Sequence, residues 1–431
     1  MLKRYLCVLI LLSIPMWGRD WYVSINRGKG KVGTIEQPAK DLGNIIALLQ
    51  PGDVVHIAEG VYLGRGENGS DVVKVPISII GGYADDFSAR DPWGAHSTIL
   101  SGNNASPNWV STPRIFIDLN LYRQNEMPPI RVDGLIIDHA GRNHYSDESR
   151  RKIVRKANPK TGSNPTPDMG ALVIGASKTN NPSGTWQITV ENCIIMNAAP
   201  TQGALTVSGH KGSQILIRNN AILNNTGVGI FLGSKYVPSD KSDVPAFTLE
   251  NNTILFTWKY DPVAQSFSGN ALEVDGATTA TLRHNVLAFS DRFGINNAKQ
   301  AKILLENNLI TGNVEADYLE FNTRIGLDDI EDEANVLDPA SSGNISKSFK
   351  VPVSPAWAKD YADRVLVDRN AMEADIKAQE SRVNDLRSML GLPLQAGTVD
   401  GPESPVWLNC LSVEDALKAV GPHEGFGAKK P

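Results

Sequence analysis

Short runs of alternating apolar and polar residues recur along the middle of the chain, and most of them are followed by asparagine. Five runs read ITVENCII (188–195), ILIRNNAI (215–222), FTLENNTI (247–254), ATLRHNVL (280–287) and ILLENNLI (303–310), and IRVDGLII (130–137) is a weaker copy. The alternation has the period of a β-strand, and the five runs start 27, 32, 33 and 23 residues apart. Such a recurring unit predicts an all-β solenoid, a parallel β-helix in which each coil pairs with its neighbours.

The asparagines occupy one position in these units. They are Asn220, Asn252, Asn285 and Asn308, and Cys193 takes the same place one unit earlier. At a tight corner between strands, asparagine tolerates the left-handed conformation, and its amide can bond the equivalent asparagine one coil away. We therefore expect an asparagine ladder with a structural role.

A second strand of each coil is marked by two nearly identical stretches, GALVIGASK (170–178) and GALTVSGHK (203–211). The later coils continue with VGIFLGSK (228–235), NALEVDGA (270–277) and FGINNAK (293–299). The alternation places these pairs in the core: Leu172/Ile174, Leu205/Val207, Ile230/Leu232 and Leu272/Val274. Two outward columns follow, one of Val173, Thr206, Phe231 and Glu273, the other of Gly175, Ser208, Gly233 and Asp275.

The ends of the solenoid have a different character. Residues 41–50 carry apolar side chains on one helical face before Pro51 and predict a capping helix, because end coils need cover. We expect the β-helix to span 19–345, with a basic insertion at 139–169. Residues 346–431 form a C-terminal extension with an amphipathic helix over about 358–390, expected on the last coil or along the flank. Ser412 is expected to begin a further short helix.

The N-terminus has the layout of a secretory signal peptide over residues 1–18. Lys3 and Arg4 precede an apolar run that is too short to cross a membrane, and Gly18 is the small residue expected before the cut. The net charge of −5 gives no indication of nucleic-acid binding. We expect a monomer that a bacterium secretes or exports to the periplasm, with no membrane span.

One stretch resembles a known family. GTIEQPAKDLGNIIALLQPGDVVHIAEGVYLG (33–64) is similar to the opening of the pectin-lyase-like right-handed β-helix proteins, in which a capping helix leads to PGD and a first strand. With the later coils, the resemblance covers roughly residues 20–345 and implies the fold. It leaves the chemistry open, because that fold carries lyases, hydrolases, epimerases and proteins without enzymatic activity.

Candidate chemistry gathers where the GAL-type strands end. The basic residues there are Lys178, His210, Lys211 and Lys235, with Lys299 further along. Two carboxylates, Glu273 and Asp275, stand beside them on the outward face. Arg142 in the basic insertion, together with Trp258 and Tyr260 before the Glu273 strand, are candidate substrate contacts, since aromatic rings stack on sugars.

Three functions are compatible with these residues. The first is a polysaccharide lyase on a uronate-containing glycan, with Lys211 or His210 as base and Arg142 or Lys235 neutralising the carboxylate, similar to lyases of the same fold. The second is a glycoside hydrolase or epimerase that uses Glu273 and Asp275, although the hydrolase and epimerase motifs of the fold are absent. The third is a glycan-binding or cell-surface protein without catalysis.

The sequence leaves the need for a metal ion open. The acidic run LDDIEDEAN (327–335) could bind Ca²⁺, but it lacks the fixed spacing of oxygen ligands in a calcium loop. A solvated turn is the preferred interpretation, and no metal ligand is assigned.

Overall fold

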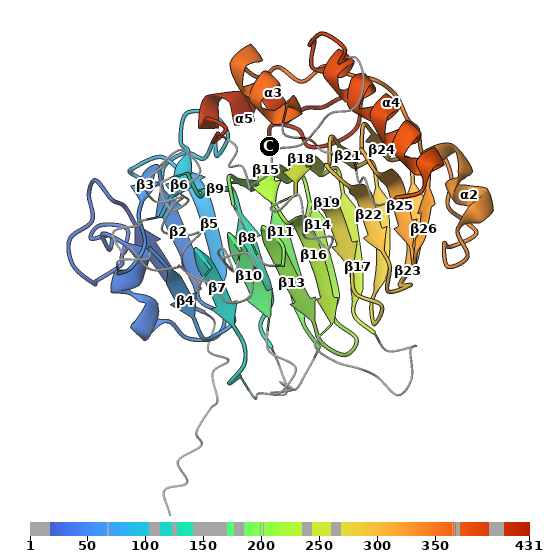
Figure 1. Cartoon of the computed structure of the whole chain (residues 1–431). Coiled ribbons are helices and arrows are strands. Elements are labelled where there is room, and N and C mark those ends of the chain that lie inside the picture. The colour runs from blue at the N-terminus through green and yellow to red at the C-terminus, as the bar shows by residue number, and fades with distance from the viewer. Residues whose placement is uncertain are drawn as a thin grey trace, which may run out of the picture.

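The computed structural model describes residues 18–66, 69–102, 113–122, 127–140, 170–175, 185–198, 200, 202–234, 244–259, 269–363, 365, 367, 371–395 and 409–431. Within these ranges the strands form three long sheets that run side by side along one axis (Figure 1). From β2 to β25 each coil contributes one strand to each sheet in turn, and each strand pairs with the strand three places away; β1 pairs with β2 and β26 with β25.

Sheet 1 begins at the N-terminus and carries the first strand of each coil. Its order is β1 (Asp20–Val23), β2 (Val54–Ala58), β5 (Ser78–Tyr83), β8 (Ile130–Asp133), β11 (Gln187–Glu191), β14 (Gln214–Arg218), β17 (Ala246–Glu250), β20 (Thr279–Arg283) and β23 (Lys302–Glu306). Ile215 pairs with Phe247, which pairs with Ala280, so like positions stack into the core.

Sheet 2 follows in every coil. Its strands are β3 (Gly60–Tyr62), β6 (Thr98–Leu100), β9 (Leu135–Asp138), β12 (Ile194–Met196), β15 (Ala221–Thr226), β18 (Thr253–Trp258), β21 (Val286–Ala288) and β24 (Leu309–Thr311). Over most of its length both faces of this sheet are buried, since one faces the interior of the solenoid and the other lies beneath the C-terminal extension; Val61 of β3, at the N-terminal end, is exposed.

Sheet 3 completes each coil and carries the GAL-type strands. Its strands are β4 (Asp71–Val73), β7 (Ile115–Asp118), β10 (Leu172–Gly175), β13 (Leu205–Gly209), β16 (Val228–Ser234), β19 (Asn270–Val274), β22 (Phe293–Asn297), β25 (Ala316–Glu320) and β26 (Thr323–Ile325). Among the described strands only β26 pairs antiparallel, with β25. The fold is a right-handed parallel β-helix, as the sequence predicts.

The asparagine ladder is present at the corner between sheets 1 and 2. The Asn252 amide nitrogen donates to the Asn285 side-chain oxygen at 2.9 Å, and the chain of such bonds runs from Asn220 to Asn308 and on to Asn344. At the other end, the Cys193 N–H donates to the Asn220 oxygen at 3.0 Å. The ladder therefore has the predicted members and one more at its C-terminal end.

The left-handed conformation belongs to the residue before each ladder position. That neighbouring column has φ near +53°, and its members are Asn192, Asn219, Asn251, His284 and Asn307. The two roles that the sequence analysis gave to one asparagine are thus divided between two adjacent residues. One residue turns the chain, and the next, fully buried, bonds to the coils on either side.

The N-terminal cap is shorter and tighter than the predicted helix. Residues 41–50 form two 3₁₀ turns, η1 (Leu42–Asn44) and η2 (Ile46–Leu48). The Asp41 side chain accepts from the Gly43 N–H at 2.6 Å, and Leu49 is already extended ahead of the Pro51 turn. This leaves too few residues for a stable α-helix.

The C-terminal extension lies along the outer face of sheet 2 (Figure 1). Of the two positions that the sequence allowed, the last coil or the flank of the solenoid, the structure has the flank. Its helices are α3 (Pro355–Ala362), α4 (Glu373–Met389) and α5 (Val413–Ala419), preceded by η4 (Leu327–Asp329) and α2 (Ile330–Glu333). Trp357 and Tyr361 set their rings edge-on against Phe256 of β18, at 4.8 and 5.0 Å between centroids.

The single helix predicted over about 358–390 is instead two helices, α3 and α4. The chain leaves α3 at Asp363, and Val365 and Val367 are buried in the same apolar cluster as α3 before α4 begins. Both residues are β-branched, which lowers their helix propensity, and their burial stabilises the segment between the two helices. Ser412 caps α5 as expected, since its hydroxyl accepts from the Asp415 N–H at 3.0 Å.

The described residues contain neither a candidate membrane span nor a candidate metal cluster. In the part of the chain that the structure describes, no helix is long and apolar enough to cross a membrane. Within the same ranges, the acidic run at 327–335 included, no group of three or more acidic, histidine or cysteine side chains is arranged to hold a metal ion.

Candidate active site on the third sheet

The outer face of sheet 3 carries a column of side chains that belong to successive coils. Thr206 pairs in register with Phe231, Phe231 with Glu273, and Glu273 with Asn296, as the alternation predicts for the first three. All four are buried although they point away from the solenoid core, and Glu273 is only 8% exposed. A carboxyl group at an outward yet buried position is unusual, because outward acidic residues are normally solvated.

Glu273 shares a lysine with Asp275, a second carboxylate that directly follows the same strand. The Lys299 ammonium nitrogen lies 3.9 Å from Glu273 Oε1 and 4.0 Å from Asp275 Oδ2. The Asn296 amide donates to Glu273 Oε2 at 3.4 Å, and the Lys299 ammonium stands 5.6 Å from the centre of the Phe231 ring. We call Glu273, Asp275, Asn296 and Lys299 the Glu273 cluster.

The two carboxylates of the cluster have different surroundings. Burial raises the pKa of Glu273, and the negative charge of Asp275 adds to this, while Lys299 and a hydrogen bond from Asn270 partly offset it. Asp275 is more open to solvent, with its side chain 19% exposed. Paired carboxyl groups in unequal surroundings can divide acid and base work, because one keeps its proton while the other loses it.

A second acidic group on this sheet shows the opposite balance. Glu315, just before β25, is also buried, but Lys259 and Arg292 each lie 2.9 Å from its Oε1. Burial alone would raise the pKa of Glu315, and the two cations more than offset this and lower it. Glu315 is therefore a fixed anion of the scaffold, whereas Glu273 is the group that can carry a proton.

These opposite shifts predict opposite effects of pH on stability. Because the folded chain holds the Glu273 proton more tightly than the unfolded chain does, the stability that this carboxyl contributes is present at low pH. It is lost as the pH rises through the raised pKa. Glu273→Gln should therefore unfold at a higher temperature than the wild type at about pH 7–8, with the gap closing near pH 4.

Glu315→Gln is the matched comparison with the opposite sign. The folded pKa of Glu315 is lowered, so its contribution is present at neutral pH and is lost on acidification. This variant should be less stable than the wild type at neutral pH. Thermal denaturation of both variants across the pH range checks the pair, and a Glu273→Gln protein destabilised at neutral pH would contradict the assignment.

The four predicted catalytic side chains divide between two places. Glu273 on β19 and Asp275 just after it belong to the Glu273 cluster. His210 and Lys211 lie on the turn after β13, and β16 runs between β13 and β19. At about 4.8 Å per strand, the backbones are roughly 10 Å apart. The His210 ring is buried and stacks on Trp186 at 5.7 Å, whereas Lys211 is exposed, so the two differ from each other as well.

Of the predicted substrate contacts, only Trp258 lies among the described residues. Lys178, Lys235, Arg142 and Tyr260 lie outside them. Trp258 ends β18, is 5% exposed and belongs to the apolar cluster between sheet 2 and the C-terminal extension. The prediction of a surface ring for sugar stacking does not hold for Trp258, because the extension covers the sheet face on which it stands.

Sequence reasoning noted Lys299 without assigning it a role, and it passed over Asn296. Both lie on FGINNAK, the repeat one coil after Glu273, so the aligned repeats contained the signal. Register alone puts Asn296 beside Glu273. Choosing Lys299 over the other strand-end lysines required the side-chain distances.

Comparisons with known proteins do not change the fold assignment, which rests on the strand pairing. No protein-family profile matches the chain, and no curated protein matches it. A solved structure that matches is that of a pectate lyase, Pel9A, at 12% identity and a TM-score of 0.37, covering 79% of this chain and 85% of the other. At that score the likeness carries no argument about activity.

Proposed function

We propose that the chain is an exported enzyme that cleaves a polysaccharide on the outer face of sheet 3, with Glu273 as the proton donor. The observation that carries the proposal is the burial of Glu273 at an outward position, beside a second carboxylate that is more open to water. A glycosidic oxygen needs a proton as its bond breaks, and a carboxyl whose pKa is raised by burial holds its proton to higher pH than a solvated one does.

Hydrolysis is the reaction that the cluster supports best. Glu273 protonates the leaving oxygen, and Asp275 takes a proton from the attacking water. Both carboxyl groups reach the same ammonium nitrogen, at 3.9 and 4.0 Å, so they stand close enough to act on one glycosidic bond with a water molecule between them. Lys299, within 4.0 Å of both carboxylates, supplies positive charge next to the pair.

Lyase action on a uronate-containing glycan is the second candidate, and the position of Lys299 favours it. Its side chain is 48% exposed, so its ammonium group can reach a substrate carboxylate. A base removes the proton next to that carboxylate, the electron pair forms a carbon–carbon double bond, and the bond to the leaving oxygen breaks as Glu273 protonates that oxygen. Lys299 takes the neutralising role that the sequence analysis gave to Arg142 or Lys235.

One assay separates these reactions and tests the proposal. The purified chain is incubated with neutral and uronate-containing polysaccharides, with and without added Ca²⁺, and new reducing ends and ultraviolet absorbance are followed together. Reducing ends without absorbance indicate hydrolysis, and both signals together indicate elimination, since only elimination leaves a conjugated double bond. Glycan binding without new reducing ends would contradict the proposal and favour a non-enzymatic surface protein.

A further inference from the structure

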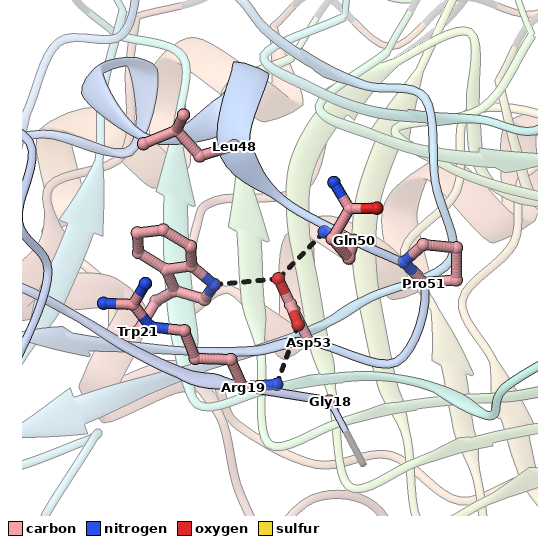
Figure 2. Close-up of a pocket in the computed structure, with 7 residues that line it drawn as sticks. All are labelled: Gly18, Arg19, Trp21, Leu48, Gln50, Pro51 and Asp53. Atoms are coloured by element: carbon pink, nitrogen blue, oxygen red, sulfur yellow. Dashed lines mark hydrogen bonds between the residues drawn. The ribbon is translucent and has the colours of Figure 1, made fainter. Parts of the chain in front are cut away.

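A buried carboxylate near the N-terminus receives donors from three places but no cation among the described residues. Asp53 is 3% exposed. Its Oδ2 accepts from the Trp21 indole and from the Gln50 N–H, and its Oδ1 accepts from the backbone N–H of Arg19, each at 2.8 Å (Figure 2). Buried charges are normally paired with an opposite charge, so these neutral donors alone leave Asp53 without the usual compensation.

The guanidinium group of Arg19 is held elsewhere. It lies 3.9 Å from the centre of the Trp21 ring, and it donates to the Val32 carbonyl oxygen at 3.0 Å. The part of Arg19 that meets Asp53 is its backbone nitrogen. The Arg19 carbonyl oxygen in turn accepts from the Val54 N–H at 3.0 Å, so this residue is fixed on both sides of its Cα atom.

Gly18, just before Arg19, fits only because it has no side chain. A Cβ atom on Gly18 would come within 1.7 Å of the Gly52 carbonyl oxygen. Gly18 is the small residue that the signal-peptide pattern predicts before the cut. The next atom along the chain after its carbonyl group is the Arg19 backbone nitrogen, which contacts Asp53. Both residues line an open pocket of about 280 Å³ beside Trp21 and Leu48.

We propose that the chain is cut between Gly18 and Arg19 and that Asp53 pairs with the α-ammonium group that the cut creates. A processing peptidase that accepts a small residue before the cut hydrolyses this peptide bond and consumes one water molecule. Gly18 then ends in a carboxylate, and the new α-amino group of Arg19 takes up a proton. The amide nitrogen 2.8 Å from Asp53 then becomes a cation in place, and its hydrogen bond becomes a buried ion pair. Processing in this way fastens the first strand to the cap, independently of the proposed function.

The test compares the full chain, a chain that begins at Gly18 and a chain that begins at Arg19. The last two differ by one neutral residue and have equal net charge, so they form a matched pair. The Arg19 chain should unfold at a higher temperature than the Gly18 chain and the full chain, by on the order of 2–4 °C at about pH 7. The difference should vanish near pH 10, where an α-amino group has lost its proton.

Asp53→Asn in both short chains should also remove the difference. Where Asp53→Asn prevents folding, the comparison at high pH decides the question with Asp53 intact. N-terminal sequencing of the protein exported from a bacterial host should start at Arg19. A different first residue, equal unfolding temperatures at neutral pH, or a difference that persists at about pH 10 would each overturn the proposal.

Discussion

Glu273→Gln is expected to lower kcat/KM on the cleaved polysaccharide by about 10²–10⁴-fold, the usual contribution of a positioned general acid. Glutamine keeps the size of the side chain and can still contact Asn296, but it has no proton to give to the leaving oxygen. Because the binding surface is otherwise unchanged, the loss should fall on kcat more than on KM. Initial rates of reducing-end release measure both parameters.

The matched control is Glu250→Gln on sheet 1. Glu250 is also an outward glutamate on a central coil with an arginine partner, Arg283, at 3.7 Å, but it stands on a different sheet from the Glu273 cluster. This variant should keep the wild-type rate. Equal activity of Glu273→Gln and wild type would remove Glu273 from the mechanism, and an equal loss in both variants would show that the effect is general.

Asn252→Ala is expected to destabilise the fold by on the order of 3–5 kcal/mol. The fully buried Asn252 side chain donates to the Ile217 carbonyl and to Asn285, and its oxygen accepts from the backbone and side chain of Asn220. Alanine leaves these partners buried without water to replace the lost bonds, so several desolvation penalties add up. Chemical denaturation followed by circular dichroism gives the free energy of unfolding.

Asn344→Ala provides the internal comparison at the end of the ladder. Asn344 is half-buried and meets only one ladder neighbour, Asn308, at 2.9 Å. Water can reach the groups that this substitution frees, so its cost should be clearly smaller than that of Asn252→Ala. Equal costs at the two positions would mean that burial does not set the strength of the ladder.

The sequence could predict the fold because a solenoid repeats one local rule. Each coil packs on a copy of itself, so the inward pair Leu205 and Val207 and the outward Thr206 follow from alternation alone, and all three take those places. The ladder from Asn220 to Asn308 follows for the same reason, since equivalent residues of adjacent coils meet. Features that lack a repeat, such as the two helices α3 and α4, were predicted less well.

The candidate site was only half accessible from the sequence. Glu273 and Asp275 stand on one face by alternation, and the structure puts them there with Lys299 between them. The contrasting surroundings of His210 and Lys211 were not accessible, because residues next to each other at a strand end can point to a buried ring or to water. Trp258 was misjudged because a segment a hundred residues later covers it.

The sequence by itself determined the strand period, the register of the coils, the ladder and the face on which Glu273 stands. These depend on contacts between equivalent positions, which a repeating pattern displays directly. Only the tertiary structure decided which lysine meets the carboxylates, which sheet the C-terminal extension covers, and that Asp53 meets the backbone nitrogen of Arg19. Those contacts join residues with no common period, so their partners depend on distances and burial that only the folded chain defines.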